Sequence, residues 1–252
     1  MTDKPVAIVT GGSRGIGRAI VTMLARRGHR VLFTYVRDQQ AAAQVEDAVR
    51  KAGGEARAMC ADAGDGDSAR ALVQVALAQF GRIDVLVNNA GVHLPGVMLA
   101  DTSAKDWEHV LRVNLSGPFH LIQAVLPHMR QRHAGNIVNL SSNVTNRFPA
   151  GAGVYTVSKI GLEAMTKILS KEEGKYGIRV NAVGPGPIAT DMLHESLAKI
   201  GEEKADAFIR SVPLGRKGTP EEIAEAVAFL VSDAASYMTG QIVFVNGGGP
   251  GG

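Results

Sequence analysis

The chain has 252 residues, of which 45% are hydrophobic and 20% charged, with 27 basic side chains against 24 acidic ones. This balance excludes an intrinsically disordered chain, and the 30 Gly and 10 Pro fall without the three-residue period of a collagen. No apolar run approaches the roughly 20 residues that span a bilayer, and the scattered basic and few aromatic side chains argue against nucleic-acid binding. With one cysteine and no apolar signal segment before the first strand-like run, the composition predicts a cytoplasmic protein.

Short β-branched runs alternate with longer helical patterns along the whole chain. Strands are predicted at residues 6–10, 30–35, 56–61, 83–87, 136–140, 178–183 and 241–245. Helices are predicted at residues 15–27, 39–51, 67–80, 103–133, 155–175 and 220–232. Because the strand runs are apolar throughout rather than alternating, we expect a parallel sheet with helices on both faces, in one doubly wound α/β domain over residues 1–252.

The segment 188–218 interrupts this alternation. It carries apolar residues at helical spacing among charged ones, which indicates one or two short amphipathic helices. Because such sheets bind ligands beyond the carboxyl ends of their strands, the segment is predicted to cover the site as a substrate lid. An ordinary surface excursion or a subunit contact is the alternative.

A glycine-rich turn at residues 10–17, the glycine turn, links the first strand to the first helix. It reads Thr10-Gly-Gly-Ser-Arg-Gly-Ile-Gly17. The pyrophosphate of a dinucleotide needs backbone N–H donors at a helix N-terminus and no side chains that block its approach. The turn is therefore predicted to bind a dinucleotide cofactor through Gly11, Ser13, Arg14, Gly15, Ile16 and Gly17.

The end of the second strand distinguishes NAD from NADP. An NAD site places a carboxylate there for the ribose 2′-OH, whereas here Tyr35 and Arg37 come first and the first acid is Asp38. A guanidinium pairs with a 2′-phosphate that a carboxylate would repel, so Arg37, assisted by Arg14, favours NADP(H). Two simply solvated arginines are the alternative. Asp62, after the third strand, is placed to hold the adenine amino group.

Three side chains after the fifth strand suggest proton transfer. Tyr155 and Lys159 lie four residues apart on a predicted helix, so their side chains share one face. A phenol with a pKa of about 10 is a poor base at neutral pH, but a neighbouring ammonium and a positively charged nicotinamide would lower that pKa. Ser142, at the end of a strand, is placed to hydrogen-bond a substrate oxygen.

In this order the motifs resemble those of the short-chain dehydrogenases/reductases of the classical type, essentially from end to end of the chain. They are Thr10-Gly-x-x-x-Gly-x-Gly17, Asp62, Asn88-Asn-Ala-Gly91, Asn114, Ser142, Tyr155-x-x-x-Lys159, Asn181, Pro185-Gly186 and Thr190. The resemblance implies a Rossmann-type sheet of seven parallel strands. It also favours Ser142 over Ser141, because the family serine lies thirteen residues before the tyrosine.

The resemblance implies a role for each motif. Tyr155 would exchange a proton with the substrate oxygen, and Lys159 would hold the nicotinamide ribose and keep Tyr155 acidic. Ser142 would steady the substrate oxygen, and Asn114 would support a water that relays protons. Cofactor contacts are expected from Asn88, Ala90, Gly91, Pro185, Gly186, Ile188 and Thr190, although for Asn88 and Asn181 bonding between strands is an equal alternative. The residues expected to line the substrate pocket are His93, Leu94, Asn143, Val144, Pro187, Met192 and Leu193.

Within the family, the second strand resembles that of NADPH-dependent 3-oxoacyl-[acyl-carrier-protein] reductases. Arg132 matches a basic position that docks the acyl carrier protein there, but Tyr176 replaces its basic companion, which argues against a carrier-protein partner. We expect an NADPH-dependent oxidoreductase that reduces a 3-oxoacyl thioester, oxo-ester or ketone to a secondary alcohol, with no metal. The alternatives are an alcohol, sugar or steroid dehydrogenase of the same family, and a non-catalytic NADP-binding regulator.

The resemblance also implies a homotetramer in which the helices after the fourth and fifth strands form an interface. Gly161 and Ala164 are expected to allow close helix packing there. The glycine-rich tail from Gly247 to Gly252 is expected to be flexible unless a neighbouring subunit covers it.

Overall fold

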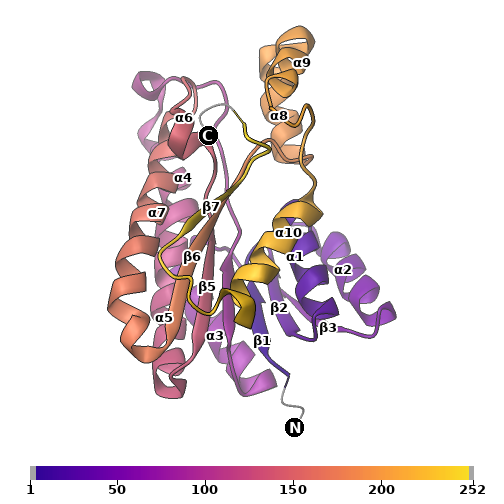
Figure 1. The fold of residues 1–252 in the computed structure, drawn as a ribbon, viewed down its shortest axis with the longest axis vertical. Helices are drawn as coiled ribbons and strands as arrows, with labels where there is room; N and C mark the ends of the chain where they lie inside the picture. The colour runs from indigo at the N-terminus through magenta and orange to yellow at the C-terminus, as the bar shows by residue number, and fades with distance from the viewer. Residues whose placement is uncertain (1–3, 250–252) are drawn as a thin grey trace.

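A parallel sheet runs through the centre of the computed structural model, which describes residues 4–249 (Figure 1). Its strands are β1 Val6–Val9, β2 Arg30–Tyr35, β3 Glu55–Cys60, β4 Val85–Asn88, β5 Gly135–Leu140, β6 Ile178–Pro185 and β7 Ile242–Val245. The strand order is β3-β2-β1-β4-β5-β6-β7, and every neighbouring pair is parallel. The predicted doubly wound α/β fold is confirmed.

Helices cover both faces of this sheet (Figure 1). They are α1 Gly15–Arg26, α2 Gln39–Lys51, α3 Gly66–Phe80, α4 Ala104–Leu111, α5 Gly117–Arg132, α6 Val144–Arg147, α7 Gly153–Glu173, α8 Asp191–Ile200, α9 Glu202–Arg210 and α10 Pro220–Val231. Short 3-10 helices span Leu99–Asp101, Gly174–Tyr176 and Asp233–Ala235. α1, α2 and α10 pack on one face, and α3, α5 and α7 pack on the other.

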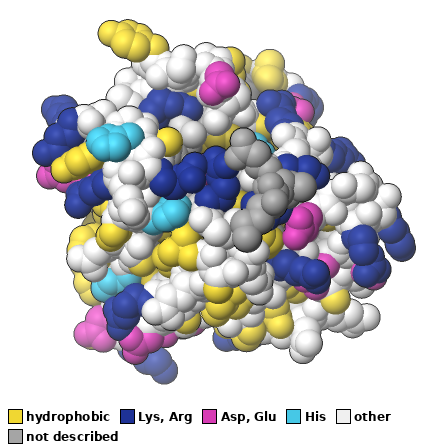
Figure 2. Space-filling model, turned by 90° about the horizontal axis from the view of Figure 1, so that it is seen from below, with side chains coloured by type: hydrophobic (Ala, Val, Ile, Leu, Met, Phe, Trp, Pro, Cys, Tyr) yellow, Lys and Arg dark blue, Asp and Glu magenta, His cyan; other side chains and the backbone are white. Residues whose placement is uncertain are grey.

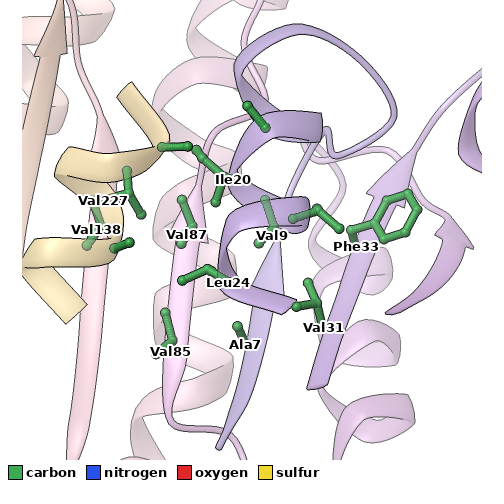
Figure 3. Close-up of a cluster of buried hydrophobic side chains, with 14 of the residues drawn as sticks. Ala7, Val9, Ile20, Leu24, Val31, Phe33, Val85, Val87, Val138 and Val227 are labelled. Atoms are coloured by element: carbon green, nitrogen blue, oxygen red, sulfur yellow. The ribbon is translucent and has the colours of Figure 1, made fainter. Parts of the chain in front are cut away.

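The strand β1 shows why the strand sequences are apolar throughout. Ala7 and Val9 face the core under α1 and α10, whereas Val6 and Ile8 face the core under α3 and α5. All four side chains are fully buried. Figure 3 shows the first of these cores, where Ile20 and Leu24 of α1 lie over the strands. A strand that is covered on both faces favours apolar side chains at consecutive positions, which explains the apolar run of β1.

The long helix predicted at 103–133 is divided. A π-helical turn, Arg112–Ser116, separates α4 from α5 and contains the buried Asn114. Pro118 is the second residue after this turn. Because proline has no N–H, it cannot donate the hydrogen bond to the carbonyl oxygen of residue 114 that an α-helix requires. The other predicted helix and strand ends lie within about two residues of the observed ones, although α6 and the 3-10 helices were not predicted.

Of the one or two amphipathic helices predicted in segment 188–218, two are present as α8 and α9, which project from the sheet (Figure 1). Arg14 of the glycine turn forms an exposed ion pair of 3.3 Å with Asp191 at the start of α8. The Arg147 guanidinium lies 5.1 Å from the centre of the Phe208 ring on α9. The segment therefore contacts both sides of the carboxyl edge of the sheet, and its action as a lid stays a prediction.

The described part of the glycine-rich tail packs on the same segment. The Leu214 N–H donates to the Gly247 carbonyl oxygen at 3.1 Å. Residues 250–252 lie outside the described part of the chain, as do residues 1–3 at the N-terminus. No helix between residues 4 and 249 is long and apolar enough to cross a membrane.

The helix α7 presents an apolar outer face. Val157, Ile160 and Ile168 are exposed on it, and Ala164 is exposed beside them. Gly161 has a different role from the expected one, because a side chain there would meet Leu115 of the same chain at 3.0 Å. Its small size serves packing inside the chain, and only the exposed residues support the predicted subunit interface.

Candidate active site

The buried ammonium of Lys159 lies at the carboxyl end of β5. Its Nζ donates to the Leu140 carbonyl oxygen at 2.7 Å, and the residue is only 3% exposed. The same Nζ lies 5.6 Å from the centre of the Tyr155 ring, so the two side chains share one face of α7 as predicted. The strand end and the helix thus hold a cation beside the phenol.

Burial has a large effect on this cation. It lowers the pKa of Lys159 from 10.5 to about 8, although the nearby charge of Glu163 opposes the shift. The ammonium is therefore still mostly protonated at neutral pH. A buried charge of this kind needs support, which here comes from a hydrogen bond to the Leu140 carbonyl oxygen and from the nearby negative charge of Glu163.

The Ser142 side chain lies close enough to the phenol of Tyr155 to act on its pKa. Burial raises the pKa of Tyr155, and the Ser142 side chain opposes this shift only in part. The expected lowering of this pKa by Lys159 is thus not a property of the chain alone, because the burial penalty on a phenolate is larger. A further positive charge next to the phenol is needed to lower it.

The two neighbouring serines are clearly distinguished. The Ser141 hydroxyl donates to Glu163 Oε1 at 2.5 Å, whereas the Ser142 side chain acts on the pKa of the phenol. The Thr145 hydroxyl donates to the same carboxylate oxygen at 2.8 Å. The geometry therefore supports the choice of Ser142 as the residue that faces Tyr155.

Glu163 is a site residue that was not predicted. Its carboxylate holds Ser141 and Thr145, the residues on both sides of the Ser142 loop, and its charge acts on Lys159. The sequence contains one usable signal, since Glu163 lies four residues after Lys159 on the same helix. The two hydroxyl partners carry no comparable signal, because they depend on how the loop folds onto α7.

Asn114 ties the loop after β4 to the helices. Its Nδ2 donates to the Val92 carbonyl oxygen at 2.8 Å and to Ser158 Oγ at 3.1 Å, and its Oδ1 accepts from the Val92 N–H at 2.8 Å. A side chain on Gly91 would meet Asn114 Oδ1 at 3.4 Å and Lys159 Nζ at 3.6 Å. Asn114 thus lies near Lys159, while its amide is occupied in holding Val92.

The glycine turn has the form that a dinucleotide phosphate requires. α1 begins without an acidic residue in its first turn, and Arg14 at its N-cap makes no side-chain cap. The backbone of Gly11 is left-handed, with φ of 67°, and a side chain on it would meet Ala90 Cα at 3.1 Å. A side chain on Gly17 would lie 2.0 Å from the Gly11 carbonyl oxygen. The turn thus leaves helix N–H groups open to an anion, and it fits a pyrophosphate.

The residues predicted around the adenosine have partners of their own. Arg37 is exposed, next to the half-buried Tyr35. Arg14 pairs with Asp191, and Asp62 pairs with Arg112 at 2.9 Å and accepts from the Gly64 N–H at 2.8 Å. Arg37 is therefore the more available of the two arginines predicted to meet a 2′-phosphate.

Two asparagines make structural hydrogen bonds of the kind that was the alternative to cofactor contact. Asn88 Nδ2 donates to Asn139 Oδ1 at 2.8 Å, which joins β4 to β5. Asn181 donates to the Met238 carbonyl oxygen at 2.9 Å and accepts from the Gln241 N–H at 3.0 Å. Asn88 thus links two neighbouring strands, and Asn181 links β6 to the residues that lead into β7.

The stretch predicted to contact the nicotinamide borders a cavity of about 90 Å³. Gly186, Pro187 and Ile188 line it, opposite Val245. Thr190 caps α8, since its hydroxyl accepts from the Leu193 N–H at 3.4 Å. The stretch thus leads from the end of β6 into the projecting helices.

Of the predicted substrate residues, the structure brings His93 to the phenol. The rings of His93 and Tyr155 lie edge to face with centroids 6.5 Å apart. Asn143 and Val144 directly follow Ser142, and Leu94 follows His93. Met192 and Leu193 lie in the first turn of α8.

Basic side chains gather on the face seen from below the sheet (Figure 2). Arg132, the predicted carrier-docking residue, lies at the end of α5 and forms an ion pair of 3.2 Å with Asp84, which precedes β4. The ring of Tyr176 lies against Arg130, at 5.3 Å from the guanidinium carbon. Arg132 is thus at the amino edge of the sheet, opposite to the edge with Tyr155, and already has an acidic partner.

Similar proteins match almost the whole chain. Residues 11–249 match the protein family described as Enoyl-(Acyl carrier protein) reductase. The chain is 38% identical over 242 residues to 3-oxoacyl-[acyl-carrier-protein] reductase FabG of Staphylococcus epidermidis, which covers 96% of this chain and 97% of the relative.

Solved structures show the same extent of similarity. A mutant of a Serratia marcescens short-chain dehydrogenase/reductase is 39% identical, with a TM-score of 0.90 over 97% of each chain. A blue fluorescent protein from a metagenomic library, solved in complex with NADPH, is 38% identical, with a TM-score of 0.87 over 97% of each chain. The likeness thus extends over almost the whole chain.

Gly17→Ala should strongly destabilise the protein, because the added Cβ would lie 2.0 Å from backbone that cannot move without opening the turn. We expect a loss of about 3 kcal/mol and a fall in Tm of about 6 °C or more in thermal unfolding followed by circular dichroism. Gly174→Ala is the control, since nothing lies within 4 Å of that position. Equal Tm values for the two variants would contradict the tight packing of the turn.

Proposed function

The chain belongs to the short-chain dehydrogenase/reductase family of oxidoreductases, and we propose that it is an NADPH-dependent carbonyl reductase. The observation that carries this proposal is the convergence of Ser142, Tyr155 and Lys159 at the carboxyl edge of the sheet. The loop after β4 connects this group to the glycine turn, since Ala90 adjoins Gly11 and Gly91 adjoins Lys159. A non-catalytic regulator would have no need for this convergence.

The cofactor proposal rests on the glycine turn and on Arg37. The turn offers open helix N–H groups to the pyrophosphate, and the exposed Arg37 offers a guanidinium to the 2′-phosphate. The similar protein solved with NADPH supports the same cofactor. When bound, NADPH supplies the hydride that reduces the carbonyl carbon. The further residues proposed to hold it are Tyr35, Asp62, Asn88, Ala90, Gly91, Pro185, Gly186, Ile188 and Thr190.

The side chains of the chain supply the proton and orient the substrate. Ser142 donates a hydrogen bond to the carbonyl oxygen, and Tyr155 gives its phenolic proton to the oxygen as the alcohol forms. Because burial raises the pKa of Tyr155, the proton stays on the phenol until the substrate oxygen takes it. Lys159, whose charge is held by Leu140 and Glu163, stabilises the phenolate that remains. Asn114 holds the loop at Val92, next to Lys159.

The proposed substrate is a small carbonyl compound, with a 3-oxoacyl thioester or an oxo-ester preferred. The similarity to a 3-oxoacyl reductase supports this preference. Arg132 is already paired with Asp84, so we propose that a carrier protein is not required. The exposed apolar face of α7 supports a homotetramer built on this helix.

Tyr155→Phe tests the role of the phenol most simply. The variant keeps the ring but has no proton to give, so NADPH should still bind while turnover of an oxo-ester falls by about 100-fold or more. Binding is measured by NADPH fluorescence and turnover by absorbance at the nicotinamide band. Tyr237→Phe is the matched control, because Tyr237 is fully exposed. Unchanged turnover in Tyr155→Phe would remove the phenol from the mechanism.

Arg37→Asp tests the choice of cofactor. The carboxylate would repel the 2′-phosphate, so we expect the Kd for NADPH to rise by about 100-fold while the Kd for NADH changes far less. Arg26→Asp is the control. It makes the same charge change at an exposed position at the C-terminal end of α1, whereas the glycine turn lies at the N-terminal end of this helix. A wild-type protein that prefers NADH would show this assignment to be wrong.

Glu163→Gln tests the electrostatic support of Lys159. Glu163 raises the pKa of Lys159, which is about 8 with the carboxylate in place, so removal of the charge lets the ammonium lose its proton at lower pH. The alkaline limb of the kcat/KM profile for reduction, at saturating NADPH, should therefore move to lower pH. Glu172→Gln, an exposed carboxylate on the same helix, should leave the limb in place. A limb that does not move in Glu163→Gln would contradict this role.

A further inference from the structure

His93 brings an unsatisfied polar atom to the phenol. Its Nε2 is buried and has no hydrogen-bond partner among the described residues. The ring lies edge to face with Tyr155, 6.5 Å between centroids, on the loop that follows β4. A buried polar atom without a partner costs free energy, so a polar atom in this place indicates a group that completes it.

The imidazole of His93 is mostly neutral at pH 7. Burial lowers the pKa of His93, and the charge of Glu195 on α8 opposes this only in part. A neutral imidazole carries one N–H and one free lone pair, and in the tautomer with its proton on Nε2 this atom donates one hydrogen bond to an uncharged carbonyl oxygen. The nearby carboxylate of Glu195 disfavours an anionic partner for the same position.

The position of His93 is suited to a substrate oxygen other than the reacting one. The proposed partners of the reacting oxygen are Ser142, in the loop after β5, and Tyr155, on α7. His93 approaches Tyr155 from a third element, the loop after β4, which is held in place by the two hydrogen bonds between the Val92 backbone and the Asn114 side chain. A substrate oxygen bound to His93 would therefore belong to a group next to the carbonyl that is reduced.

We propose that His93 is a specificity-determining residue that hydrogen-bonds a second, uncharged oxygen of the substrate, next to the carbonyl that is reduced. The preferred substrates are then dicarbonyl compounds such as oxo-esters, and simple ketones of the same size are poorer substrates. This inference rests on the proposed carbonyl reductase activity.

The test compares matched pairs of ketones in His93→Phe. Phenylalanine keeps an aromatic ring against Tyr155 and removes the nitrogen. The pairs are ethyl 2-oxopropanoate with hexan-2-one and ethyl 3-oxobutanoate with heptan-2-one. The members of a pair share chain length, but the ketone lacks the carbonyl and alkoxy oxygens of the ester group. Because each oxo-ester is intrinsically more reactive, the informative quantity is the change in the kcat/KM ratio within a pair between wild type and variant. His194→Phe, at an exposed position on α8, is the matched control.

We expect the ratio to fall about tenfold or more for at least one pair in His93→Phe, with unchanged NADPH affinity, and to stay constant in His194→Phe. Ratios that are unchanged for both pairs in His93→Phe would overturn the inference and leave the proposed reductase activity intact. Loss of NADPH affinity in His93→Phe would assign the residue to the cofactor site and would also overturn it. No reduction of any of the four compounds by the wild type would overturn the proposed function and the inference with it.

The anionic 3-oxobutanoate tests the claim that the second oxygen is uncharged. Its kcat/KM should be at least about tenfold lower than that of its ethyl ester in the wild type, because Glu195 repels it. Glu195→Gln should narrow this difference. An anion that the wild type reduces as well as the ester would contradict the neutral partner.

Discussion

The burial of one ammonium next to one phenol is the constraint on which the site depends. Lys159 loses most of its contact with water, and the cost is offset by the Leu140 carbonyl oxygen and the charge of Glu163. The same burial raises the pKa of the adjacent Tyr155. The two groups are thus shifted in opposite directions by one environment: the amine is made a weaker base and the phenol a weaker acid. Each shift is set by geometry that the fold fixes before any ligand binds.

The sheet provides that geometry. Because parallel strands end at one edge, the Leu140 carbonyl of β5, the loop after β4 and the glycine turn after β1 meet there. Packing on both faces fixes the strands. The helix α7 packs against the sheet and carries Tyr155 and Lys159 one helical turn apart. The carboxylate of Glu163, one turn further, closes the Ser142 loop onto the same helix. Support for the site therefore comes from the same helix that carries the reacting group.

Several features could be predicted from sequence because they depend on local chemistry. Doubly covered strands must be apolar, so their positions were recognisable, and the spacing of Tyr155 and Lys159 fixed their common face. Interactions between elements were less accessible. The bond from Ser141 to Glu163 and the ion pair of Arg14 with Asp191 depend on how loops fold onto helices far away in sequence. The burial that raises the pKa of Tyr155 in the chain alone was not foreseen for a related reason: spacing reveals the neighbouring cation, but it does not reveal burial. The lowering of this pKa by a bound nicotinamide stays a prediction.

The central claim is that the phenol of Tyr155 is held protonated by burial and becomes acidic only when a second positive charge joins Lys159. It is tested most directly by the pKa of this phenol, followed by NMR of protein with ¹³C-labelled tyrosine, with and without NADP⁺. The account predicts a pKa above the ordinary value of about 10 in the chain alone and a clear fall when NADP⁺ binds. A pKa that NADP⁺ leaves unchanged, or one already well below 10 in its absence, would contradict it.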